Sequence, residues 1–161
     1  MDGVKRIYSL EEAQKKIEYY CAYQERCHFE VAAKLKSFGL LQVSIDHLIL
    51  KLMESNFLNE ERYARAFVSG KFRIKKWGRI KITNKLKAKN ISKNCIEIGL
   101  SEINEHEYMD LLNSIVESKW LEKKNNRNEY QFKSQLARYL FSKGFENDLI
   151  WLTINKMNGR D

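Results

Sequence analysis

The sequence contains no proline and only seven glycines among its 161 residues. Proline breaks helices and glycine loosens them, so a chain this poor in both is predicted to consist of helices joined by short turns. An all-β sandwich would need many more residues that favour turns. The sequence therefore predicts an all-α protein.

The sequence also lacks long apolar runs and a pattern of paired cysteines. No uninterrupted apolar stretch approaches the roughly 20 residues of a transmembrane helix, and the first residues lack the apolar core of a signal peptide. We therefore expect a cytoplasmic protein with no membrane partner. Cys21, Cys27 and Cys95 do not have the spacing of metal ligands, which favours reduced, mostly buried thiols.

Sequence patterns of catalysis are missing as well. Gly70 and Gly78 are isolated and form no phosphate-binding loop, and neither HExxH nor GxSxG occurs. His28, His47 and His106 are far apart in the chain. The acidic pairs lie at predicted helix starts, where the helix dipole explains them. We predict a protein that is not an enzyme and that uses no cofactor and no metal.

What the sequence does contain is a weak threefold repeat. Segments 31–40, 82–91 and 136–145 each place an apolar residue four positions before a leucine, which puts both on one helix face. Four positions after that leucine come Gly39, Asn90 and Gly144, respectively, followed by an apolar residue. Glycine and asparagine tolerate the positive φ that a helix end requires.

Further helices flank each of these segments. Helices are predicted over 10–23, 60–75 and 107–123 before them, and an apolar i, i+4, i+7 pattern starts after them at Ile45, Ile96 and Ile150. In the helix over 60–75, Asn59 is a good N-cap, and Tyr63, Phe67 and Ile74 are predicted to face inward.

The predicted fold is three tandem three-helix repeats, at 1–58, 59–104 and 105–161, forming an elongated, curved array. One such unit has a marginal core, so neighbouring units are expected to pack together. The alternative is one irregular bundle of nine helices without true repeats.

The whole net charge of +8 falls in the middle repeat. Residues 59–104 hold twelve basic and four acidic side chains, whereas the flanking repeats are each neutral. Segment 62–96 contains no Asp or Glu, so its basic residues have no acidic neighbours in the sequence. This pattern favours an anionic partner, either a nucleic acid or an acidic protein surface, over an ordinary solvated face.

The candidate binding residues come from this segment. They are Arg62, Arg65, Lys71, Arg73, Lys75, Lys76, Arg79, Lys81, Lys85 and Lys89. Trp77 lies between the two basic helices and could stack on a base, although packing between helices is the favoured interpretation. The second basic helix lacks the Asn, Gln and Arg pattern that reads base edges, so sequence-specific recognition is not predicted.

The segment 57–68, FLNEERYARAFV, resembles the RecX family, and so do 75–80, KKWGRI, with Leu86 and the Lys89-Asn90-Ile91 ending. Asn59 stands where the family often has Asp, and Asn90 where it often has Gly, but asparagine keeps both capping roles. The resemblance covers most of the chain and is specific over about 55–91. Arg62, Lys75, Lys76, Arg79 and Lys89 match family motif positions.

This resemblance implies a non-catalytic bacterial regulator of the RecA recombinase in DNA repair, recombination and the SOS response. Members of the family bind the RecA–DNA filament and inhibit strand exchange and ATP hydrolysis, and many bind single- and double-stranded DNA. We expect a monomer in the cytoplasm. The alternatives are a nucleic-acid-binding protein that acts without RecA and without sequence specificity, and a transcription factor that binds one particular site as a symmetric dimer.

Overall fold

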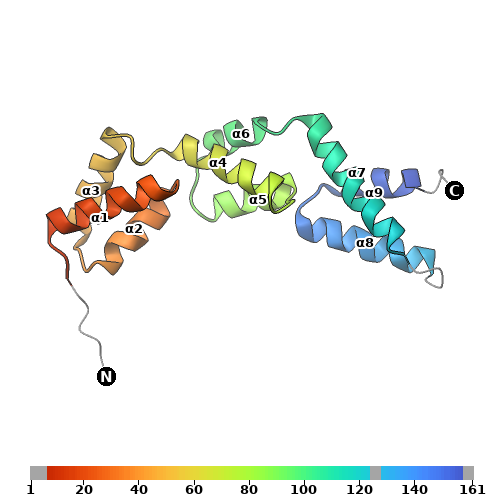
Figure 1. Ribbon diagram of the computed structural model, residues 1–161, viewed down its shortest axis with the longest axis horizontal. Coiled ribbons are helices and arrows are strands. Elements are labelled where there is room, and N and C mark those ends of the chain that lie inside the picture. Colours follow the sequence, from red (N-terminus) through yellow and green to blue (C-terminus); the bar gives the residue numbers. More distant parts are fainter. Residues whose placement is uncertain (1–6, 124–127, 158–161) are drawn as a thin grey trace, which may run out of the picture.

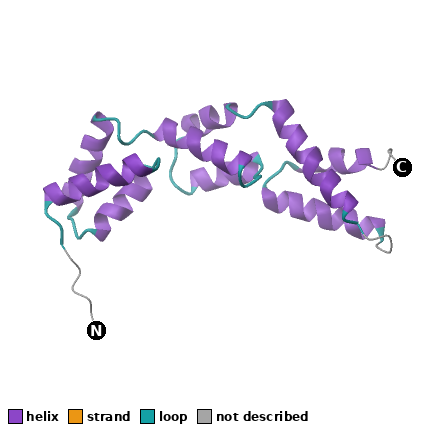
Figure 2. Cartoon of the chain, in the orientation of Figure 1, coloured by secondary structure: helices purple, strands orange, loops and turns teal. Residues whose placement is uncertain are grey.

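A computed structural model describes residues 7–123 and 128–157, and within these ranges all regular secondary structure is helical (Figure 2). The helices run in chain order as α1 (Leu10–Tyr23), α2 (His28–Ser37), α3 (Gln42–Glu54), α4 (Glu60–Arg73), α5 (Arg79–Lys87), α6 (Lys93–Ser101), α7 (Glu105–Leu121), α8 (Glu129–Lys143) and α9 (Asn147–Met157). The predicted all-α fold is confirmed. None of the helices in the described ranges is long and apolar enough to cross a membrane.

The helices pack in three consecutive groups, which lie in a row along the long axis (Figure 1). We call them the first unit (α1–α3), the second unit (α4–α6) and the third unit (α7–α9). The first and third units lie at opposite ends, and the second unit lies between them. The expected elongated arrangement of three-helix units is therefore present.

Helix boundaries follow from capping groups in the sequence. Asn59 caps α4 by accepting a hydrogen bond from the backbone N–H of Arg62 at 2.9 Å, as predicted. The predicted positive φ is also confirmed at all three repeat positions, with +82° at Gly39, +58° at Asn90 and +94° at Gly144. These residues turn the chain sharply after α2, α5 and α8.

Several bounds of the predicted helices differ from the structure. The helix predicted over 107–123 spans Glu105–Leu121. The helix predicted over 60–75 ends at Arg73, so Ile74 does not face inward and is 76% exposed. Lys76 adopts a φ of +57° in the turn that follows, which directs the chain into α5. Ile103 is buried as its spacing from Ile96 predicts, but it lies beyond the end of α6.

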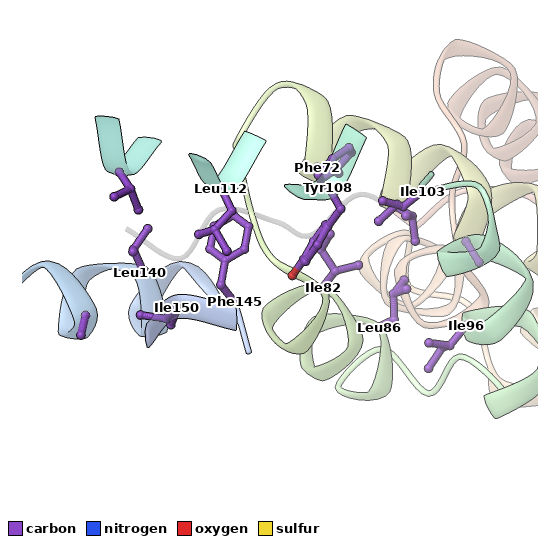
Figure 3. Packing of buried hydrophobic residues seen from close by; sticks show 14 of the residues in the cluster. Phe72, Ile82, Leu86, Ile96, Ile103, Tyr108, Leu112, Leu140, Phe145 and Ile150 are labelled. Atoms are coloured by element: carbon purple, nitrogen blue, oxygen red, sulfur yellow. The ribbon is translucent and has the colours of Figure 1, made fainter. Parts of the chain in front are cut away.

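The buried side chains form two clusters rather than three. The first unit has a core of its own, which includes Ile17, Leu35 and Leu48. The second and third units share a single core, in which Phe72 and Ile82 from one unit lie close to Tyr108 and Phe145 from the other (Figure 3). The expected packing between neighbouring units is thus strongest at one of the two junctions.

Candidate functional site

The ten predicted binding residues lie on α4, on α5, and in the turns that follow these helices. The structure divides them into two sets with different surroundings. One set forms ion pairs with carboxylates of helices or of the loops between them: Arg62, Arg65, Arg73, Arg79 and Lys89. Most of these carboxylates come from 26 or more residues away in the sequence, and Glu61 lies just four residues before Arg65. In the fold, this set of basic side chains therefore has acidic partners that the acid-free segment 62–96 did not indicate.

Arg62 and Lys89 connect the second unit to the first. The Nε of Arg62 lies 2.5 Å from Oε1 of Glu25, and its Nη2 also donates to the carbonyl of Asn56 at 3.0 Å. The Nζ of Lys89 lies 2.7 Å from Oε1 of Glu30. Burial alone would raise the pKa of Glu30, but hydrogen bonds from Lys89 and from the backbone of Cys27 lower that pKa below its ordinary value.

Arg65 pairs with glutamates within the second unit, and Arg73 pairs with a glutamate of the third unit. Arg65 bonds Glu61 on its own helix at 2.9 Å and also pairs with Glu102. Arg73 pairs with Glu107 of α7 at 3.1 Å. These side chains are about half exposed, so their ion pairs contribute modestly to stability.

Arg79 is the most enclosed of the paired residues. Its guanidinium stacks on the ring of Tyr108, with its central carbon 3.9 Å from the ring centroid, and it contacts Glu105 at 2.6 Å and Glu146 at 3.5 Å. Burial opposes its charge, but the Glu105 hydrogen bond and the two carboxylates raise the pKa of Arg79. Arg79 therefore holds the second and third units together.

The remaining residues are lysines with no carboxylate partner in the described part of the chain: Lys71, Lys75, Lys76, Lys81 and Lys85. Lys81 donates to the backbone carbonyl of Ser142 at 3.1 Å, so it also contacts the third unit. Lys75, Lys76 and Lys85 are exposed. We call Lys71, Lys75, Lys76 and Lys85 the open lysines.

The apolar residues beside the open lysines are partly accessible. Lys71 and Lys81 flank Trp77, with their Nζ atoms 5.2 Å and 4.7 Å from its ring centroids. Trp77 packs against the shared core and is half-buried, as the favoured interpretation predicted. A groove of about 580 Å³ runs beside α4 toward the first unit, and Phe67, Gly70 and Ile74 line it together with Lys71 and Lys75.

This arrangement can bind anions, and it offers few groups for covalent chemistry. In the ranges 7–123 and 128–157 no group of three or more His, Cys, Asp or Glu side chains could hold a metal ion. Cys21 and Cys27 are buried and unpaired, and burial raises the pKa of the Cys21 thiol to about 11 and that of Cys27 above its ordinary value. A raised thiol pKa disfavours the nucleophilic thiolate.

Reasoning from the sequence missed a second basic surface, on the first unit. Lys15, Lys16, Tyr19, Tyr20 and Tyr23 lie along α1 beside a groove between α1 and α2. The signal for it was present as lysines followed by tyrosines at spacings of three and four residues. Summing charge over a whole repeat concealed that signal, because the first repeat is neutral.

Comparisons with known proteins agree with the fold. Residues 59–100 match the family description "RecX, second three-helix domain", and residues 106–154 match "RecX, third three-helix domain". Regulatory protein RecX of Finegoldia magna is 31% identical over 81% of this chain and 64% of its own length. Regulatory protein RecX of Lactobacillus gasseri is 27% identical over 86% of this chain, which spans about half of that relative.

Two solved structures share the arrangement of helices. A crystal structure of regulatory protein RecX superposes with a TM-score of 0.80 at 19% identity, covering 91% of this chain and 73% of that chain. RecX from Lactobacillus salivarius superposes with a TM-score of 0.77 at 22% identity, covering 92% and 96%. At these identities the structures support the fold, while the two family matches together cover more than half of the sequence. The chain belongs to the RecX family of regulatory proteins.

Proposed function

We propose that this protein binds the RecA–DNA filament and restrains RecA's ATP hydrolysis and strand exchange, without a catalytic activity or cofactor of its own. It acts as a monomer in the bacterial cytoplasm. The three repeats, 1–58, 59–104 and 105–161, form the units of an elongated binding surface. Family membership supports a regulatory role, since the curated relatives carry the name "Regulatory protein RecX".

The observation that carries the proposal is the set of open lysines in the central unit. Several cations without acidic partners on one unit attract phosphates and acidic protein surfaces, and that attraction weakens as salt screens it. The paired residues Arg62, Arg79 and Lys89 fix the positions of the neighbouring units instead. The open lysines therefore supply attraction, and the flanking units extend the contact, so weak sites combine into a stronger one.

The test is DNA-dependent ATP hydrolysis by RecA on preformed single-strand filaments, with this protein titrated in. We expect inhibition below one protein per RecA subunit. The variant Lys75→Glu/Lys76→Glu should need roughly tenfold more protein for half-inhibition, because it reverses two exposed charges that steer association. Arg79 is unsuitable for this test, since its loss would also disturb the junction with the third unit.

A matched control reverses two exposed lysines elsewhere, Lys36→Glu/Lys156→Glu, which changes the net charge equally. If both variants lose the same inhibition, net charge rather than the open lysines is responsible. Inhibition that appears only when the protein is abundant enough to coat the DNA would favour the alternative, a nucleic-acid-binding protein that acts without RecA. That alternative also predicts equal binding to DNA with and without RecA.

A further inference from the structure

The groove between α1 and α2 combines basic and aromatic side chains, although residues 1–58 carry no net charge. It has a volume of about 530 Å³, and its lining includes Lys15, Lys16, Lys34, Tyr19, Tyr20 and Tyr23. It lies on a different unit from the open lysines and shares no lining residue with the groove beside α4. We call it the tyrosine–lysine groove.

Two tyrosines of the groove have rings that are largely exposed to solvent. Tyr19 is 72% exposed and Tyr23 is 76% exposed, and the two lie one helical turn apart on α1. Their ring centroids are 6.4 Å apart with an interplanar angle of 25°. The structure thus presents two nearly parallel aromatic rings to solvent at the edge of a basic groove.

The lysines of the groove contact aromatic rings rather than carboxylates. Lys16 lies 5.2 Å from the ring centroid of Tyr8, and Lys34 lies 5.6 Å from that of Tyr20. In the described ranges, Lys15, Lys16 and Lys34 have no carboxylate within ion-pair distance. The groove is therefore positively charged where it borders the exposed rings.

Two carboxylates of the first unit are directed toward the second unit rather than toward this groove. Glu25 and Glu30 pair with Arg62 and Lys89 of the second unit. Glu12 belongs to the capping box at the start of α1, and Glu18 accepts a hydrogen bond from Gln14. The described lining of the groove therefore contains lysines but no Asp or Glu, although residues 1–58 as a whole hold eight basic and eight acidic side chains.

We propose that the tyrosine–lysine groove binds single-stranded DNA, with unpaired bases stacked on Tyr19 and Tyr23 and phosphates along Lys15, Lys16 and Lys34. Exposed aromatic rings beside a basic track are the two components of proteins that bind single strands without reading sequence. A duplex offers its phosphates but keeps its bases stacked within the helix, so it would use only the lysines. This site rests on the proposed function, because a protein on a RecA filament meets single-stranded DNA.

The test measures binding of the full chain, without RecA, to a fluorescein-labelled oligothymidylate of about 16 nucleotides by fluorescence anisotropy. Tyr19→Leu/Tyr23→Leu should raise the Kd about tenfold or more, since each stacked base contributes substantially. Tyr19→Phe/Tyr23→Phe keeps both rings and should bind nearly as the native chain does. Tyr130→Leu, at a tyrosine that is 77% exposed on α8, is the matched control and should leave the Kd unchanged.

Two further ligands separate stacking from charge. An abasic strand of equal length and a duplex both keep the phosphates, so the leucine double variant should bind them as the native chain does. Lys15→Gln/Lys16→Gln should weaken binding to all three ligands and lower the dependence of log Kd on log salt by about 0.7 per lost phosphate contact on a single strand. Circular dichroism checks that each variant retains its helices.

The proposal is overturned if the leucine double variant binds oligothymidylate as tightly as the native chain, or if it weakens binding to the abasic strand equally. A native chain that fails to bind oligothymidylate also overturns it. None of these results bears on the RecA assay, in which the open lysines are tested. Loss of RecA inhibition in Lys75→Glu/Lys76→Glu with intact oligothymidylate binding would show that the two surfaces act separately.

Discussion

The two junctions between the units are built in different ways. The second and third units share one apolar core, and backbone groups cross the boundary: the N–H of Gly78 donates to the carbonyl of Lys143 at 2.9 Å, and the N–H of Ile80 donates to Gly144 at 3.0 Å. The first and second units have separate cores, apart from Cys27, which is buried in the second core. Their junction relies largely on side-chain ion pairs.

The difference continues in how well polar groups are satisfied. At the second–third junction the hydroxyl of Tyr108 donates to Glu146 at 2.6 Å and accepts from the backbone N–H of Arg79 at 3.1 Å. At the first–second junction, buried Oε2 of Glu25 and Nε of Arg26 lack hydrogen-bond partners among the described residues. The first–second junction thus depends on ion pairs of partly exposed side chains, whereas the second–third junction adds a shared apolar core.

Three similar helical units are thus joined in two different ways within one chain. Because the second and third units share one core, we expect them to move together more than either moves with the first unit. The tyrosine–lysine groove lies on the first unit, and the open lysines lie on the second. A compliant junction between them would let one surface engage a strand while the other engages the filament.

The largest expected effect comes from adding a methyl group at Gly78. A Cβ there would lie 2.3 Å from the carbonyl oxygen of Gly144 and 2.5 Å from the backbone nitrogen of Phe145, so the backbone of the third unit would have to shift. We expect Gly78→Ala to lower the free energy of unfolding of the shared core by about 3 kcal/mol or more, as overpacking and loss of backbone hydrogen bonds do. Urea denaturation followed by circular dichroism measures this.

Gly70 provides the matched control for that substitution. It lies within α4, and a Cβ there would meet no atom within 4 Å. Because glycine inside a helix is less stable than alanine by roughly 0.5–1 kcal/mol, Gly70→Ala should leave stability unchanged or raise it. Equal losses from Gly70→Ala and Gly78→Ala would contradict a tightly packed second–third junction.

The next effect concerns the Tyr108 hydroxyl. Tyr108→Phe keeps the ring between Phe72 and Phe145 but removes the bonds to Glu146 and to the Arg79 backbone. We expect a loss of about 1–3 kcal/mol, because the backbone donor and the carboxylate lose a buried partner. Tyr130→Phe, on an exposed ring, should cost nearly nothing in the same denaturation experiment. A harmless Tyr108→Phe would show that apolar contact alone holds this junction.

The sequence predicted the helices well because their signals are local. Asn59 as an N-cap and the positive φ of Gly39, Asn90 and Gly144 depend on a few neighbouring residues. The end of α4 was missed by two residues, since Ile74 and Lys75 continue a helical pattern until Lys76 turns the chain. Terminal turns are where local preference is weakest.

The candidate site was predicted only in part, because ion pairs depend on tertiary structure. The partners of Arg62, Arg79 and Lys89 are 37, 26 and 59 residues away in sequence, so the acid-free segment 62–96 concealed them. The acid-free segment indicated exposed basic side chains without acidic partners, and in the described ranges this holds for Lys75, Lys76 and Lys85. The tyrosines of α1 needed the structure, because only burial distinguishes the exposed Tyr19 and Tyr23 from core residues.

A smaller effect should follow from breaking the first–second junction. Lys89→Met removes the 2.7 Å ion pair with Glu30, and both side chains are only partly exposed, at 27% and 22%. We expect a coupling energy of about 1 kcal/mol or less from a double-mutant cycle with Glu30→Gln, measured by urea denaturation. The coupling should shrink in high salt. A coupling as large as the Tyr108→Phe effect would contradict the difference between the junctions.

The smallest predicted effect is a dependence of the first–second junction on acid. Hydrogen bonds hold the pKa of Glu30 below its unfolded value of 4.5, so its ionised form is favoured in the folded chain. That contribution is fully present above the unfolded pKa and is lost as pH falls through the folded pKa. Denaturation at pH 7 and in acid should therefore show a smaller pH-dependent loss for Glu30→Gln than for the native chain. Because Glu30 faces Lys89 across the junction, Lys89→Met should reduce the same loss, whereas Tyr130→Phe should not; equal pH dependence in all three variants would remove Glu30 as its source.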